Sequence, residues 1–206
     1  MNNTAENNSK NSNDINENSK SLRKLSVVVS VYNEEKALRE FYKETNKILE
    51  QIRKSGWEHE LIFVNDGSSD NSLSILEELA KEDHDVKLIS FSRNFGHEAA
   101  MIAGIDHSTG DGIICMDADL QHPPECIPKI IEKFDAGYEV INMVRTKNES
   151  AGLIKNITSS GFYWLINHIS DVHFEPNASD FFAISRHVAQ VLKNHYREKV
   201  RFLRGY

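Results

Sequence analysis

LSVVVSVY, residues 25–32, is a short run of apolar and mostly β-branched residues. Such a run is typical of a strand that is buried on both faces of a parallel sheet. Apolar residues then recur at helical spacing from residue 37 to residue 54, and Gly56 ends that helix. A second apolar run, ELIFVN at 60–65, predicts the next strand. The order strand, helix, strand favours an α/β sheet.

The same alternation of strands and helices continues along the chain. We expect strands at 86–91, 112–117 and 140–144, and helices at 98–106, 123–134, 154–169 and from about Ser185 onward. Ser69 or Asp70 is expected to N-cap a helix that runs to Leu79, and a short extended piece is expected near Phe174. The pattern predicts a single α/β domain with a mostly parallel central sheet flanked by helices.

The composition is that of a globular protein with an excess of acidic residues. The 206 residues include 24 basic and 31 acidic ones, and the net charge of −7 argues against a nucleic-acid partner. Residues 1–23 are rich in Asn, Ser, Glu and Lys and predict a disordered polar tail before a domain at 24–206. No run approaches the roughly 18 apolar residues that span a bilayer, and the first residues lack the apolar segment of a signal peptide.

Acidic residues gather where the expected strands end. In parallel sheets, ligands bind outside the carboxyl ends of the strands. Asp117 and Asp119 follow a buried strand, and extended backbone points residues two apart to the same side. Two close carboxylates repel each other unless a cation neutralises them, so the pair suggests a site for Mg²⁺ or Mn²⁺. The alternative for Asp-x-Asp alone is a solvated turn that caps the next helix.

Other kinds of site lack their motifs. No G-x-G-x-x-G follows the first strand and no G-x-x-x-x-G-K-[ST] occurs, which disfavours a dinucleotide site and a P-loop. Neither His-x-x-x-His nor Cys-x-x-Cys is present, so no zinc site is expected. Cys115 lies within an expected strand and is interpreted as a core residue. Asp66 is a candidate to bind a base or a ribose, whereas Asp70 is interpreted as a helix cap.

Six segments carry a resemblance to a known family. They are SVVVSVYNEE (26–35), VNDGSSDNS (64–72), SRNFGHEAAMIAG (92–104), MDADLQHPPE (116–125), SDF (179–181) and RFLRGY (201–206). In this order they resemble family 2 glycosyltransferases, and more closely the polyprenyl-phosphate branch of dolichyl-phosphate mannose synthases and bactoprenol glucosyltransferases. The resemblance implies the Rossmann-like GT-A fold. It also implies inverting transfer of a sugar from a nucleotide-diphosphate donor, with a UDP-sugar favoured.

The resemblance assigns roles to individual residues. The donor-binding positions would be Ser30, Tyr32, Glu34, Asp66, Asp117, Ala118, Arg145, Lys155 and Arg201. Asp117, Asp119 and Gln121 would hold Mg²⁺ or Mn²⁺ on the donor diphosphate. Asp180 matches the aspartate proposed as base in this family, and Asp119 is the second catalytic candidate. The sequence departs from the family pattern at Ser30, where Pro is usual, at Ser179, where Gly is usual, and at Phe182, where Arg is frequent.

The implied acceptor is a polyprenyl phosphate at the cytoplasmic side of the cell membrane. Members of this branch continue past RFLRG into transmembrane helices, so we expect the C-terminal membrane part to be missing from this sequence. The aromatic run at 162–166 and the basic cluster at 197–204 are candidates for contact with the membrane surface. Core packing and a solvated basic face are the alternatives for these two segments. A homo-oligomer of the full-length protein stays open.

Three other functions stay open on the sequence alone. A family 2 transferase that extends a cell-wall or capsular glycan would need Asp180 as a true base. A phosphohydrolase with Asp117 as nucleophile usually has Thr or Val after the second aspartate, where Leu120 stands here. A non-catalytic nucleotide-sugar sensor would bind the donor without turnover.

Overall fold

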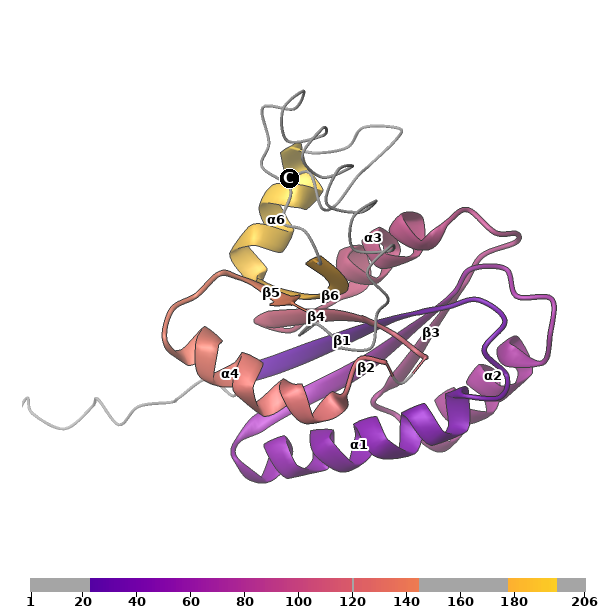
Figure 1. The fold of residues 1–206 in the computed structure, drawn as a ribbon, viewed down its shortest axis with the longest axis horizontal. Helices are drawn as coiled ribbons and strands as arrows, with labels where there is room; N and C mark the ends of the chain where they lie inside the picture. The colour runs from indigo at the N-terminus through magenta and orange to yellow at the C-terminus, as the bar shows by residue number, and fades with distance from the viewer. Residues whose placement is uncertain (1–22, 120, 145–177, 196–206) are drawn as a thin grey trace, which may run out of the picture.

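The computed structural model describes residues 23–119, 121–144 and 178–195, and these form one six-stranded sheet. Four strands are parallel, namely β1 (Arg23–Val31), β2 (Trp57–Asn65), β3 (Val86–Ser90) and β4 (Gly112–Asp117). The other two are β5 (Val140–Val144) and β6 (Ala178–Ser185), and β6 pairs antiparallel with both β4 and β5. The strand order is β3-β2-β1-β4-β6-β5 (Figure 1). The prediction of a mostly parallel sheet is therefore confirmed.

Helices cover both faces of the sheet, as predicted (Figure 1). One face carries α1 (Leu38–Lys54), α2 (Ser72–Glu82), the short 3-10 helix η1 (Pro124–Cys126) and α4 (Ile127–Asp135). The other face carries α3 (His97–His107) and α6 (Arg186–His195). The described part of the chain is thus a three-layer α/β/α structure.

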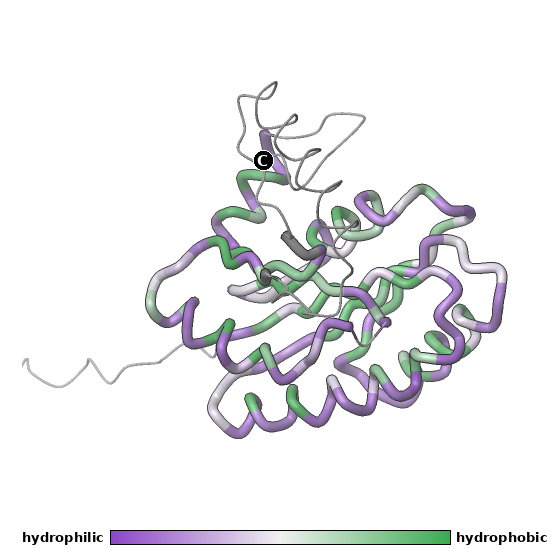
Figure 2. The backbone as a smooth tube through the Cα atoms, viewed as in Figure 1, coloured by the Kyte–Doolittle hydropathy of each residue, from purple (hydrophilic) through white to green (hydrophobic). Residues whose placement is uncertain are grey.

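Successive side chains of β1 point to opposite faces of the sheet and so contribute to both hydrophobic cores. Val27 and Val29 pack with the helices of the α1 face, whereas Val28 packs under α3, and all three are fully buried. Figure 2 shows apolar stretches along the central strands and mixed hydropathy along the outer helices. Burial on both faces explains why this strand reads as a continuous apolar run. Cys115 is buried in the α3-face core, as expected, and burial raises the pKa of its thiol.

The strand β6 was not predicted. Its sequence, ASDFFAIS, contains one β-branched residue, and it includes Asp and two Ala, residue types that are depleted in strands. The expected helix at 123–134 is also divided. Pro123 has extended backbone because it precedes another proline, and η1 and α4 follow in its place.

The start of α2 differs slightly from the prediction. The N-cap is Asn71 rather than Ser69 or Asp70, although the carboxylate of Asp70 accepts the N–H of Ser72 at 3.0 Å. Of the predicted tail at 1–23, residues 1–22 lie outside the described residues, whereas Arg23 is the first residue of β1. The predicted helix at 154–169 and the extended piece near Phe174 also lie outside the described residues. Within the described ranges, no helix has the length and apolarity needed to cross a bilayer.

A buried carboxylate holds together the edge of the sheet where the parallel strands begin. Glu60 of β2 accepts hydrogen bonds from Ser26 (2.6 Å), Lys87 (2.6 Å) and the N–H of Thr109 (2.6 Å), and Lys24 lies 3.1 Å away. Burial alone raises the pKa of Glu60, but the hydrogen bonds from Lys87, Ser26, Thr109 and Lys24 outweigh it and lower the pKa to about 2.

We expect Glu60→Gln to lower the free energy of unfolding by about 3 kcal/mol at pH 7, because each pKa unit between the folded and unfolded states corresponds to about 1.4 kcal/mol. Since the folded pKa of Glu60 lies below its ordinary value of 4.5, the wild-type advantage is complete above that value. It is lost as the pH falls toward 2. Urea unfolding of both proteins at pH 7 and pH 3 measures the difference. An equal gap at the two pH values would contradict the ionised role of Glu60.

Candidate active site

The carboxyl ends of the parallel strands meet at one edge of the sheet, as the sequence predicted. Parallel pairing aligns Ser30 of β1 with Asp117 of β4. Because β6 is antiparallel, its first residues reach the same edge. Cys115 of β4 pairs with Phe182 of β6, and two more residues along this register bring Asp180 opposite Asp117. The candidate metal-binding and acceptor-side aspartates are therefore neighbours.

Hydrogen bonds join the loops that follow β1 and β2. The side-chain oxygen of Asn33, a residue with a positive φ of 57°, accepts the N–H of Ser69 at 2.8 Å. The N–H of Asn33 donates to the hydroxyl of Ser68 at 3.0 Å, and the N–H of Glu34 donates to the hydroxyl of Ser72 at 2.9 Å. These reciprocal bonds fix Glu34 at the edge of the sheet.

Asp66, a predicted donor-binding residue, lies at this edge, and both of its carboxylate oxygens accept hydrogen bonds. It is 2% exposed, and its two oxygens accept the N–H groups of Phe95 (2.7 Å) and Gly96 (3.0 Å). Gly96 has a φ of +101° and precedes α3, so these bonds fix the point where that helix begins. The first residue of α3 is His97. Asp66 thereby holds in place the backbone next to His97.

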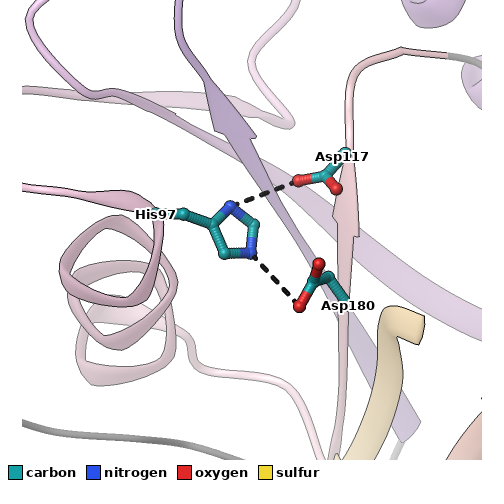
Figure 3. Close-up of side chains that lie close together, drawn as sticks. All are labelled: His97, Asp117 and Asp180. Atoms are coloured by element: carbon teal, nitrogen blue, oxygen red, sulfur yellow. Dashed lines mark ion pairs between the residues drawn. The ribbon is translucent and has the colours of Figure 1, made fainter. Parts of the chain in front are cut away.

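His97, Asp117 and Asp180 form a cluster at the centre of the edge. The Nδ1 atom of His97 lies 3.3 Å from a carboxylate oxygen of Asp117, and its Nε2 atom lies 4.0 Å from one of Asp180. Figure 3 shows the imidazole ring between the two carboxylates. About a third of each of these side chains is exposed, so the cluster is open to a ligand.

A second histidine supports Asp117 from within the protein. The N–H of Asp117 donates to Nδ1 of His122 at 3.3 Å. The His122 ring is 2% exposed and lies 5.2 Å from the ring of Phe181, the residue after Asp180. His122 therefore links the two strands that carry the aspartates.

The negative charge of this edge affects Glu34. Burial raises the pKa of the Glu34 carboxyl, and the carboxylates of Asp119, Asp117 and Asp70 raise it further. Because these three carboxylates contribute to the raised pKa, their negative charges act on Glu34 and on one another. A divalent cation would relieve their mutual repulsion, and the donor set suits it, because carboxylate oxygens and an imidazole nitrogen are established metal ligands. The residues therefore fit a metal site.

The other predicted positions lie around this cluster or outside the described residues. Asp119 is partly buried, and its carboxylate accepts the N–H of the exposed Gln121 at 3.0 Å. Ser30 is buried near the end of β1, Ala118 is buried directly after β4, and Tyr32 is 48% exposed. The predicted cationic positions outside the described residues are Arg145, Lys155 and Arg201.

His97 is the candidate residue that the sequence reasoning missed. It lies in the segment SRNFGHEAAMIAG, whose place after a strand end was the available signal. Its proximity to Asp117 depends on the order of β1, β2 and β4 in the sheet and on which face α3 covers. Neither property can be read from residue spacing.

Comparisons with known proteins agree with this fold and identify the family of the chain. Residues 26–192 match the family described as glycosyl transferase family 2. An uncharacterized glycosyltransferase of Bacillus subtilis (strain 168), YkcC, is 43% identical over 180 residues, which cover 87% of this chain and 54% of the relative. The prophage bactoprenol glucosyl transferase homolog of Escherichia coli (strain K12) is 45% identical over 170 residues, which cover 82% of this chain and 55% of the relative. The chain spans just over half the length of these relatives.

A solved structure supports the fold. Glucosyl-3-phosphoglycerate synthase from Mycobacterium tuberculosis, in complex with Mn²⁺, UDP and phosphoglyceric acid, matches with a TM-score of 0.56 at 18% identity. The match covers 82% of this chain and 58% of that chain. At this identity the likeness shows the fold, and the predicted GT-A fold is confirmed. The family match over residues 26–192, together with the relatives that are 43% and 45% identical, shows that this chain belongs to glycosyl transferase family 2.

Proposed function

We propose that this chain carries the catalytic residues for transfer of a sugar from a UDP-sugar to a polyprenyl phosphate, with inversion at the anomeric carbon. The observation that carries the proposal is the placement of Asp117 and Asp180 on the two sides of His97 at the carboxyl edge of the sheet. The name of the Escherichia coli relative, bactoprenol glucosyl transferase homolog, supports the lipid acceptor.

The residues at the edge have distinct roles in this reaction. Asp117 and Asp119 would hold a divalent cation, which supplies positive charge that stabilises the diphosphate leaving group. Tyr32, Glu34 and Asp66 would hold the nucleotide. Asp180 orients the acceptor. A phosphate acceptor is largely ionised at neutral pH, since its second pKa is near 6, so Asp180 need not act as a strong base.

We place the acceptor at the cytoplasmic side of the cell membrane, and we assign residues 24–206 to the catalytic domain, preceded by a polar tail. Membrane segments of a longer protein, and assembly into a homo-oligomer through them, belong to the same proposal. A nucleotide-sugar donor is supported by the family, and Mg²⁺ or Mn²⁺ would serve as the cation.

A transfer assay tests the proposed function. The 206-residue chain is incubated with Mn²⁺, undecaprenyl phosphate in detergent micelles and radiolabelled UDP-glucose, UDP-galactose or GDP-mannose. We expect label from a UDP-sugar to enter the organic phase. Transfer only to a water-soluble glycan acceptor would overturn the lipid acceptor in favour of glycan extension. Donor binding without transfer to either acceptor class would overturn the proposed activity.

A further inference from the structure

We propose that His97 is a metal ligand in this chain, and that it forms a divalent-cation site with Asp117 and Asp180. Among the described residues, these three form the group whose potential ligand atoms all lie within 4.8 Å of one another. Of the metal ligands that the family resemblance implies, this group contains Asp117, and it adds a nitrogen donor from His97 and a carboxylate from Asp180. It deepens the proposed function, because the cation would lie at the proposed transfer site.

The distances between the potential ligand atoms approach those between the ligands of a bound metal ion. In octahedral coordination with metal–ligand bonds near 2.1 Å, neighbouring ligand atoms lie about 3 Å apart. The 3.3 Å between Nδ1 of His97 and the Asp117 carboxylate already approaches this spacing. The Asp180 carboxylate lies 4.0 Å from the same ring. Because Nδ1 faces Asp117 and Nε2 faces Asp180, the ring has to turn for one of its nitrogens and both carboxylates to bind a single ion. The partial exposure of all three side chains leaves room for this movement and for further ligands.

The backbone around each ligand is held by buried groups. Asp66 fixes the residues just before His97 through the N–H groups of Phe95 and Gly96. His122 accepts the N–H of Asp117. Supporting hydrogen bonds of this kind orient ligands before the ion arrives, and they are a usual feature of metal sites in proteins. The cluster therefore has the support that a binding site needs, in addition to its donor atoms.

A histidine ligand bears on which ion is bound. Mn²⁺ shares the carboxylate ligands that suit Mg²⁺ but, as a transition-metal ion, also accepts an imidazole nitrogen, whereas Mg²⁺ is held by oxygen ligands. A site with one imidazole and two carboxylates should therefore bind Mn²⁺ more tightly than Mg²⁺. Asp180 can take part as a ligand because an ionised acceptor phosphate needs no strong base.

Metal binding measured without nucleotide tests the inference directly. Titration of Mn²⁺ into the full chain at pH 7.5, followed by the electron paramagnetic resonance signal of free Mn²⁺, gives the dissociation constant. We expect His97→Ala to weaken Mn²⁺ binding by at least tenfold, and Asp180→Asn to do the same. We also expect the preference for Mn²⁺ over Mg²⁺, measured by competition, to disappear in His97→Ala. His97→Asn, of similar size, serves if the alanine variant does not fold.

His107, the last residue of α3, provides the matched control. Its ring lies 2.8 Å from the carbonyl oxygen of Ala103, away from the cluster, and His107→Ala should leave Mn²⁺ binding unchanged. Unchanged or tighter binding in the His97 variants would overturn the inference, since the imidazole would then be a competing cation between two carboxylates.

The measurement separates this inference from the proposed function. His97-dependent Mn²⁺ binding with no sugar transfer to any acceptor would leave the metal site standing and remove the proposed activity. Sugar transfer with Mn²⁺ binding that is indifferent to His97 would leave the activity standing and remove the inference.

Discussion

Replacement of Asp117 by asparagine is expected to lower the rate of sugar transfer by about a thousandfold at saturating donor. Asp117 lies nearest to His97, faces the strand that carries Asp180, and contributes to the field that raises the pKa of Glu34. Loss of one pre-organised electrostatic group at a transfer site typically costs between a hundredfold and a thousandfold, and loss of metal affinity adds to it. Steady-state transfer rates with Mn²⁺ measure the effect.

The structure offers a close control for this variant. Asp111 precedes β4 at the opposite end of the same strand, where its carboxylate accepts the N–H of Lys24 at 2.9 Å. Asp111→Asn should transfer sugar at the wild-type rate. Asp117→Asn should keep the wild-type fold by circular dichroism, because the amide has the same shape and removes one repelling charge. A folded Asp117→Asn protein with wild-type transfer would refute the role of Asp117.

Gly67→Ala is expected to destabilise the protein by about 3 kcal/mol, the largest stability effect that we predict for one methyl group. Gly67 has a φ of +65°, and a Cβ atom there would lie 2.2 Å from the carbonyl carbon of Arg93 and 2.6 Å from the amide nitrogen of Asn94. Both are backbone atoms, so no side-chain rotation relieves the contact. The loop would have to move, and with it the Phe95 and Gly96 amides that Asp66 holds. Urea unfolding measures the loss of stability.

Gly56→Ala separates the two causes of that loss. Gly56 has a φ of +88°, but a Cβ atom there would meet no atom within 4 Å, so its substitution costs backbone strain alone, about 1 kcal/mol. We therefore expect the loss in Gly67→Ala to exceed that in Gly56→Ala by roughly 2 kcal/mol. Equal losses would mean that the loop at residues 92–96 accommodates the methyl group freely.

The parts of the fold that the sequence predicted are those in which burial dictates composition. β1 and β4 are buried on both faces, so both are rich in apolar residues, as in Val27–Val29 and Ile113–Met116, and can be recognised without a structure. The acidic residues that follow these strands were expected at one edge of the sheet, because parallel strands bring their carboxyl ends together. Asp117, Asp66 and Glu34 were therefore located correctly at one edge before any contact was known.

The parts that the sequence did not predict depend on pairing between distant segments. β6 pairs on both sides with β4 and β5 through backbone hydrogen bonds, which require no particular side chain. Its residue Asp180 was singled out through the resemblance to the family, and only the antiparallel register places it opposite Asp117. His97 comes near Asp117 because α3 packs over β1 and β2, an arrangement without a local sequence signal.

Calorimetric titration of the chain with UDP, GDP, UDP-glucose and GDP-mannose, each with and without Mn²⁺, shows whether the acidic edge of the sheet is the donor site of a metal-dependent glycosyltransferase. We predict binding of UDP and a UDP-sugar that requires Mn²⁺ and is lost in Asp117→Asn but kept in Asp111→Asn. A folded chain that binds no nucleotide, or that binds equally well without metal and without Asp117, would contradict this assignment of the edge.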